Sequence, residues 1–427
     1  MNTIGKEIYA FAERLFPIHR SITGEGVRKT LRTIQEEIPE LMIHEVPSGT
    51  QAFDWTVPPE WNIRDAYILA PNGEKIVDFQ ESNLHVVGYS TPVDQVFPLE
   101  ELQEHLYTLP EQPDAIPYIT SYYKRRWGFC LSHSQLKALK PGKYRVVIDS
   151  EFNESGSLTY GEVILPGSEK EEIFLSTYIC HPSMANNEIS GPVVTTFLSK
   201  WLQTQKRKYT YRIIFIPETI GAIVYLSRNL MEMKANVIAG FLLTCVGDDK
   251  AYSYLSSRAE NTLADQIALH VLEHGHPQFK KYTYLDRQSD ERQYCSPGVD
   301  LPVVSVMRSK YGTYPEYHTS LDNLDFISPS GLQGAYEVLQ KCIVCLETNE
   351  KYQVTVLCEP QLGKRGLYPS LSTKKSTEKV RDMRNFIAYA DGTRTLLDIA
   401  NKIEVPMWTL IPIAQRLKQE GLLNIVA

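Results

Sequence analysis

The spacing of hydrophobic residues changes several times along the chain. Residues 3–38 have apolar side chains three or four positions apart, as in helices, with one interruption at 21–26. From about residue 143, near-continuous apolar runs such as 211–216 and 301–307 alternate with helical patterns. Strands that are apolar along their whole length are typical of sheets covered on both faces. The pattern therefore predicts an α/β core, in which a mixed, mostly parallel sheet lies between helices.

Two further segments have a different pattern. Residues 48–135 are rich in aromatic residues and prolines, and their short alternating runs predict a small β-rich insertion. Residues 366–427 show helices followed by an apolar strand, in the order typical of a winged helix-turn-helix. The predicted parts are a core from residues 1–45 and 140–350, a β-rich insertion from 46–139, and a linker with a winged helix from 351–427.

Composition and charge narrow the classes of function. The chain has 427 residues, of which 43% are hydrophobic and 22% charged, so it is not a disordered or fibrous protein. Its net charge of -7 argues against nucleic acid or an anionic membrane as the main partner. There is no apolar run of the ~20 residues that span a bilayer, and the first residues lack a signal-peptide pattern. Seven scattered cysteines favour free thiols in a reducing cytoplasm.

Polar residues with catalytic or ligand chemistry come directly after successive apolar runs. These are His181, Glu218, Thr244, Asp248, Asp290 and the segment 311–318. In α/β sheets, ligands bind beyond the carboxyl ends of the strands, where such residues meet. Each residue also has a structural alternative: Glu218 suits the first turn of a helix, and Asn187 suits a turn or an N-cap. Their joint placement after consecutive strands nevertheless predicts one functional site.

Three of these segments, 180–191, 217–221 and 317–323, resemble motifs of the zinc-dependent aminopeptidase fold. Over essentially its whole length, the chain resembles a bacterial family of aminopeptidase-like proteins with an inserted domain of unknown function and a C-terminal winged helix. The resemblance implies a zinc-exopeptidase-like core that hydrolyses a peptide or amide bond near a free amino terminus.

The resemblance also implies roles for individual residues. His181 and His318 match the two histidine ligands, and Glu218 matches the general base. Asn187, Thr219 and Thr244 stand where the family has carboxylate ligands.

These replacements change the expected metal content. Two Zn²⁺ ions about 3.5–4 Å apart need shared negative charge to offset their repulsion. We therefore expect one Zn²⁺ per chain, held weakly by His181, Asn187 and His318, with Asp248 or Asp290 as alternative third ligands. Glu218 would then activate a metal-bound water for attack on the amide bond.

The substrate pocket is expected to have both charged and aromatic walls. Asp290 is a candidate partner for a substrate ammonium group, and Tyr311, Tyr314 and Tyr317 are candidate walls. The β-rich insertion is expected to overhang the pocket and restrict it to a small peptide or an amide-containing small molecule.

Two other functions remain open from the sequence. The metal centre has lost carboxylates, so the alternative is a degenerate aminopeptidase-like protein that binds a small molecule or peptide without hydrolysis. DNA binding by the winged helix is a minor alternative, because its second helix is apolar where a recognition helix presents hydrogen-bond donors. Self-association into a homo-oligomer is also left open, and no membrane partner is expected.

Overall fold

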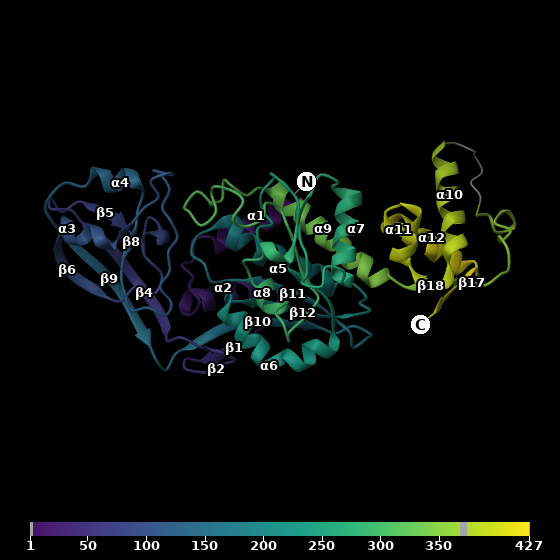
Figure 1. Cartoon of the computed structure of the whole chain (residues 1–427), viewed down its shortest axis with the longest axis horizontal. Coiled ribbons are helices and arrows are strands. Elements are labelled where there is room, and N and C mark those ends of the chain that lie inside the picture. The colour runs from purple at the N-terminus through teal and green to yellow at the C-terminus, as the bar shows by residue number, and fades with distance from the viewer. Residues whose placement is uncertain (1–2, 368–373, 427) are drawn as a thin grey trace. The chain divides into compact units, whose positions relative to one another are not determined.

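An eight-stranded mixed sheet forms the centre of the larger part of the molecule (Figure 1). The computed structural model describes residues 3–367 and 374–426. The strand order is β1 (Met42–Pro47), β10 (Ser157–Leu165), β12 (Thr210–Ile216), β11 (Glu172–Tyr178), β13 (Val237–Leu242), β16 (Val303–Met307), β14 (Ser253–Leu255) and β15 (Lys280–Tyr282). The central strands β12, β11, β13 and β16 run parallel. Strands β1 and β10 pair antiparallel with their neighbours, and β14 is antiparallel to β16 but parallel to β15. This sheet confirms the predicted fold class.

Helices cover both faces of this sheet. Adjacent residues of a strand point to opposite faces. On β10, Gly161 lies against Leu31 of α2, whereas the ring of Tyr160 packs against Tyr225 of α6. All residues of β11 are buried, as expected of a strand between two helical layers. The helices around the sheet are α1 (Ile4–Leu15), α2 (Glu25–Glu37), α5 (Ser190–Gln203), α6 (Ile220–Asn236) and α8 (Glu291–Tyr294). Helix α9 (Pro329–Thr348) begins in this unit and ends in a second one.

A separate four-stranded antiparallel sheet forms the β-rich insertion. Its order is β5 (Lys75–Asp78), β4 (Glu60–Leu69), β9 (Lys143–Asn153) and β6 (Val93–Pro98). Burial alternates along β9, so one face of the sheet packs on an apolar cluster that includes Phe129 and Leu131. The sequence pattern placed the end of the insertion at residue 139, but β9 lies beyond this position and pairs within the insertion sheet. The boundary differs because a local sequence pattern does not reveal which strand another strand pairs with.

Shorter elements lie either before β4 or between β6 and β9 of this sheet. They are β2 (Gln51–Ala52), β3 (Trp55–Thr56), α3 (Leu99–Leu102), β7 (Leu106–Tyr107), β8 (Phe129–Cys130) and α4 (His133–Ala138).

A second compact unit comprises residues 265–279 and 337–427. It contains most of α7 (Leu263–Gly275) and a three-stranded sheet with the order β18 (Asp391–Thr395), β17 (Lys351–Val354) and β19 (Leu423–Val426). Its helices are α10 (Lys374–Tyr389), α11 (Leu396–Ile403) and α12 (Met407–Gln419). The predicted order of helices followed by an apolar strand is present as α10, α11, α12 and β19. No helix within the described residues is long and apolar enough to cross a membrane.

Candidate active site

The site lies at the carboxyl ends of three adjacent parallel strands. His181 follows β11, Glu218 follows β12 and Thr244 follows β13. Because these strands run parallel and in register, their ends meet at one edge of the sheet. The predicted convergence of these segments is therefore present in the structure.

A buried carboxylate orients His181. Its Nδ1 atom lies 2.8 Å from Glu188 Oε2, and its Nε2 atom lies 3.6 Å from Glu218 Oε2. Arg20 donates to the carbonyl of His181 and lies 3.5 Å from the second Glu188 oxygen. Burial lowers the pKa of His181, but the hydrogen bond and charge of Glu188, together with the charge of Glu218, raise it overall. The imidazole is thus held with Nε2 toward Glu218.

Glu218 has the surroundings of a general base. Ser289 donates a hydrogen bond of 2.7 Å to Oε1, and the backbone N–H of Glu218 donates to Cys180 Sγ at 3.2 Å. Burial raises the pKa of this carboxyl, although the charge of His181 opposes the shift. A raised pKa brings a carboxylate closer to the strength that proton transfer near neutral pH requires.

His318 and Asn187 meet on the other side of His181. The Nε2 atom of His318 lies 3.1 Å from Asn187 Oδ1, and the ring centroids of the two histidines are 5.5 Å apart. Asn187 lies in a π-helical turn, η3 (Ala185–Ile189), and its amide nitrogen donates to Tyr178 at 2.8 Å. This bond directs the amide oxygen toward His318. Burial and the charge of His181 lower the pKa of His318 to about 3, so its ring is neutral.

The donors near His318 fit one zinc ion and not two. Two ligand atoms on a tetrahedral zinc ion lie about 3.3 Å apart, close to the separation of His318 Nε2 and Asn187 Oδ1. The hydroxyl of Thr244 donates to the carbonyl of Asn187, and that of Thr219 accepts from Arg292, so neither replaces a carboxylate. Without these carboxylates, the charge of a second ion would be poorly compensated.

Asp248 does not reach this site. It is fully buried, and its carboxylate accepts hydrogen bonds from Asn186, Lys250 and Ser309. Its suggested role as a third ligand is therefore wrong, because the strand end turns this side chain into the interior.

Asp290 lies behind Glu218. One of its oxygens accepts from the backbone N–H of Thr219 at 2.7 Å, and the other has no hydrogen-bond partner. Burial, followed by the charge of Glu218, raises the pKa of Asp290 well above 3.8. A carboxyl that favours its neutral form is a poor partner for an ammonium group, and Asp290 does not line the cavity.

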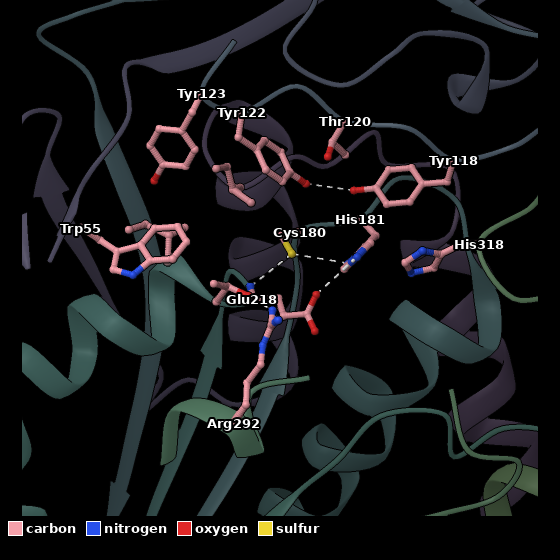
Figure 2. Close-up of a pocket in the computed structure, with 13 residues that line it drawn as sticks. Trp55, Tyr118, Thr120, Tyr122, Tyr123, Cys180, His181, Glu218, Arg292 and His318 are labelled. Carbon is pink, nitrogen blue, oxygen red and sulfur yellow. Dashed lines mark hydrogen bonds and ion pairs between the residues drawn. The ribbon is translucent and has the colours of Figure 1, made fainter. Parts of the chain in front are cut away.

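A cavity of about 350 Å³ opens over His181 and Glu218 (Figure 2). Its lining residues are Ile22, Trp55, Tyr118, Thr120, Tyr122, Tyr123, Cys180, His181, Glu218, Thr219, Ile220, Arg292 and His318. The aromatic wall, which we define as Trp55, Tyr118, Tyr122 and Tyr123, comes from the inserted region. The insertion therefore supplies one side of the cavity, as expected from the sequence.

The tyrosines predicted to wall the pocket lie elsewhere. Tyr311 and Tyr314 are buried, and their hydroxyls bond to Glu291 and to Asp322, respectively. Tyr317 stacks on the ring of His318, with centroids 3.8 Å apart. None of the three lines the cavity, so their predicted contact with substrate differs from the structure. They contact Glu291, Asp322 and His318 from outside the cavity.

Several residues that shape the site were not predicted from the sequence. Glu188 could have been predicted as a site residue, because it lies in the same motif as His181. Arg292 follows Asp290 in sequence and suggests an ion pair with it, yet its guanidinium bonds to Thr219. No sequence motif identified the aromatic wall.

Within the described residues, Cys180, His181 and Glu188 also place ligand atoms within 4.8 Å of one another. Glu188 is already engaged by His181 and Arg20, so this group is better described as support for the imidazole.

Comparisons with known proteins agree with this architecture. A family model described as a domain of unknown function (DUF4910) matches residues 9–349, and a winged helix-turn-helix model matches residues 350–425. A relative from Clostridium acetobutylicum, named as a polysaccharide biosynthesis protein with an aminopeptidase-like domain, is 48% identical over 401 residues. The match covers 93% of this chain and 91% of the relative.

Solved structures show the same fold. A crystal structure from Clostridium acetobutylicum, described as a peptidase, has a TM-score of 0.93 at 45% identity, covering 99% of this chain and 97% of that chain. BSAP, a zinc aminopeptidase from Bacillus subtilis, has a TM-score of 0.58 at 12% identity, covering 80% and 94% of the two chains. These matches confirm the predicted aminopeptidase-like fold and the C-terminal winged helix.

Proposed function

Since the chain belongs to the DUF4910 family and its core has the fold of a zinc aminopeptidase, we propose that it hydrolyses a peptide or amide bond near a free amino terminus. One observation carries this proposal: His181, Glu218 and His318 meet beside one cavity. A volume of about 350 Å³ suits a small peptide or an amide-containing small molecule.

The proposed mechanism assigns proton transfer to Glu218. One zinc ion, held by His181, Asn187 and His318, would supply a Lewis acid for the amide carbonyl. Above its raised pKa, Glu218 is ionised and takes a proton from a water molecule as the water oxygen attacks the carbonyl carbon. The same carboxyl then gives that proton to the leaving nitrogen as the C–N bond breaks. Ser289 keeps Oε1 engaged and leaves Oε2 toward His181.

The substrate class also has support outside the site. The name of the Clostridium relative places that protein in polysaccharide biosynthesis. We therefore include amides of amino sugars among the substrates to be tested. Seven free cysteines support a cytoplasmic location for this activity.

The decisive variant is Glu218→Gln, which keeps the shape of the side chain but removes the base. With a panel of aminoacyl anilides, dipeptides and N-acyl amino sugars, we expect zinc-dependent release of amine by the wild-type protein. The variant should lose at least a hundredfold in kcat, since a positioned general base contributes about 10²–10⁴-fold. Glu100→Gln, on the exposed helix α3, is the matched control. Equal rates for Glu218→Gln and wild type, together with no bound zinc in protein purified without chelators, would refute the proposal.

A second candidate function is ligand binding without hydrolysis. It is favoured by the neutral side chains of Asn187, Thr219 and Thr244, which leave little negative charge for a metal ion. In that case the cavity retains its ligand, whereas no member of the panel is cleaved at any zinc concentration.

A further inference from the structure

Arg292 is the only lysine or arginine among the residues that line the cavity. Its side chain extends toward Glu218 from the side opposite the aromatic wall (Figure 2). Within the described residues it forms no ion pair with a carboxylate, and its one side-chain hydrogen bond is to the hydroxyl of Thr219, at 2.7 Å. A guanidinium has five N–H donors, so most of them remain available to a ligand.

The backbone holds Arg292 next to the proposed base. Thr219, which anchors the guanidinium, directly follows Glu218 and has φ 63 and ψ -80. This region is costly for a β-branched residue, and such strain persists only where surrounding contacts maintain it. Here the contact is the 2.7 Å hydrogen bond from Thr219 N–H to Asp290. A group bound by Arg292 is therefore placed beside the carboxyl of Glu218.

We propose that Arg292 binds a carboxylate of the substrate, so that the preferred substrates are small amides that carry a carboxylate close to the bond that is cleaved. This inference deepens the proposed function and rests on it for the identity of the bond. A guanidinium matches a carboxylate through two parallel hydrogen bonds. The aromatic wall would meanwhile contact the flat or apolar body of the same molecule.

A carboxylate fits this position better than a phosphate. A phosphate carries close to two negative charges at neutral pH. Arg292 offers a single compensating cation, and the nearby Glu218 would repel the second charge. Dipeptides and other small aminoacyl amides with an acidic group satisfy the proposed chemistry, because they combine a free amino terminus with a carboxylate close to the amide bond.

The experiment compares two ligands that cannot be hydrolysed, phenylacetate and 2-phenylethanol, which share a body but differ in charge. Binding is measured by calorimetry on the full-length protein, both metal-loaded and after chelator treatment, so that a metal ion cannot account for the result. We expect the wild type to bind phenylacetate at least tenfold more tightly, as for a hydrogen-bonded charge pair. Arg292→Ala should abolish this preference, and Arg292→Lys should retain part of it.

Arg64→Ala is the matched control, because Arg64 lies on the insertion sheet and pairs with Asp149 and Glu151. It should leave the preference unchanged. Should Arg292→Ala not fold, as judged by circular dichroism, Arg292→Lys still tests the proposal through its weaker, single-point contact.

Three outcomes would overturn the inference: equal or undetectable binding of both ligands by the wild type, an undiminished preference in both Arg292 variants, or tighter binding of inorganic phosphate than of phenylacetate. None of these measurements requires turnover. A failure of the proposed hydrolysis is seen separately, as the absence of Glu218-dependent cleavage of neutral amides.

Discussion

At His181, a buried carboxylate determines which ring nitrogen faces the cavity. Glu188 is hydrogen-bonded to Nδ1 of the ring, so Nε2 points toward Glu218. Arg20, which is 1% exposed, compensates the charge of Glu188. A carboxylate behind an imidazole ligand fixes its orientation and raises its basicity. In the proposed zinc site, the histidine would therefore bind the ion without a change of rotamer.

In the proposed zinc site, the neutral amide of Asn187 would limit the affinity for the ion. We expect Asn187→Asp to bind zinc at least about tenfold more tightly than the wild type, because a charged oxygen replaces a neutral amide next to His318. Competition with a chromogenic chelator measures the dissociation constant, and elemental analysis gives the stoichiometry. Asn72→Asp, in an exposed turn, serves as the control. Unchanged zinc affinity in Asn187→Asp would show that this side chain does not contact the metal.

The residue types after each strand made much of the site predictable. His181, Glu218 and His318 were identified because parallel strands bring their carboxyl ends together. The orientation of side chains was not predictable, since it depends on partners far away in sequence. Asp248 faces Ser309, and Tyr311 bonds to Glu291, although both stand near residues that do reach the cavity.

Elements were predictable in proportion to their length. The buried strands β11 and β12 and the long helix α9 were evident from continuous patterns of apolar residues. Strands β14 and β15 have three residues each, too few to show a period, and were not anticipated. The π-helical turn at Ala185–Ile189 also has no pattern in the sequence, because it differs from an α-helix by a single extra residue per turn.

One carboxylate links three elements of the larger unit. Glu60, at the start of β4, accepts two hydrogen bonds from Arg28 of α2 and one from the backbone of Ser157 on β10. Burial raises the pKa of Glu60, but the bonds from Arg28 and Ser157 outweigh it and lower the pKa to about 2. The ionised form is therefore part of the folded structure.

We expect Glu60→Gln to lower the free energy of unfolding by about 2 kcal/mol at pH 7. Because the folded-state pKa lies below the value of 4.5 in the unfolded chain, this stability is present above pH 4.5 and is lost as the pH falls toward 2. Urea denaturation of both proteins at several pH values measures the difference. Exposed Glu104→Gln is the control, and a difference that does not shrink on acidification would contradict the assignment.

At the scale of the whole molecule, charge argues against a nucleic-acid partner. The net charge is -7, and Arg416 on α12 is paired with Glu420. The buried face of α12 comprises Met407, Leu410, Ala414 and Leu417, and its exposed face includes Pro412, which offers no donor to a base edge.

We therefore predict that the full-length protein shows no binding to duplex DNA at low salt. Fluorescence anisotropy with a labelled random duplex tests this, beginning at low ionic strength, where phosphate contacts are strongest. Tight binding that weakens steeply with added salt would instead assign a nucleic-acid role to the winged helix.

The cavity draws its walls from positions as distant as Ile22, Trp55 and His318. During synthesis, the lining cannot be complete until the segment that carries His318 has left the ribosome, long after the residues of the aromatic wall have emerged. Contacts between such distant positions also close slowly, because the intervening chain must first be ordered. A nascent or truncated chain therefore exposes the tyrosines without the rest of the cavity, and the complete site forms late in folding.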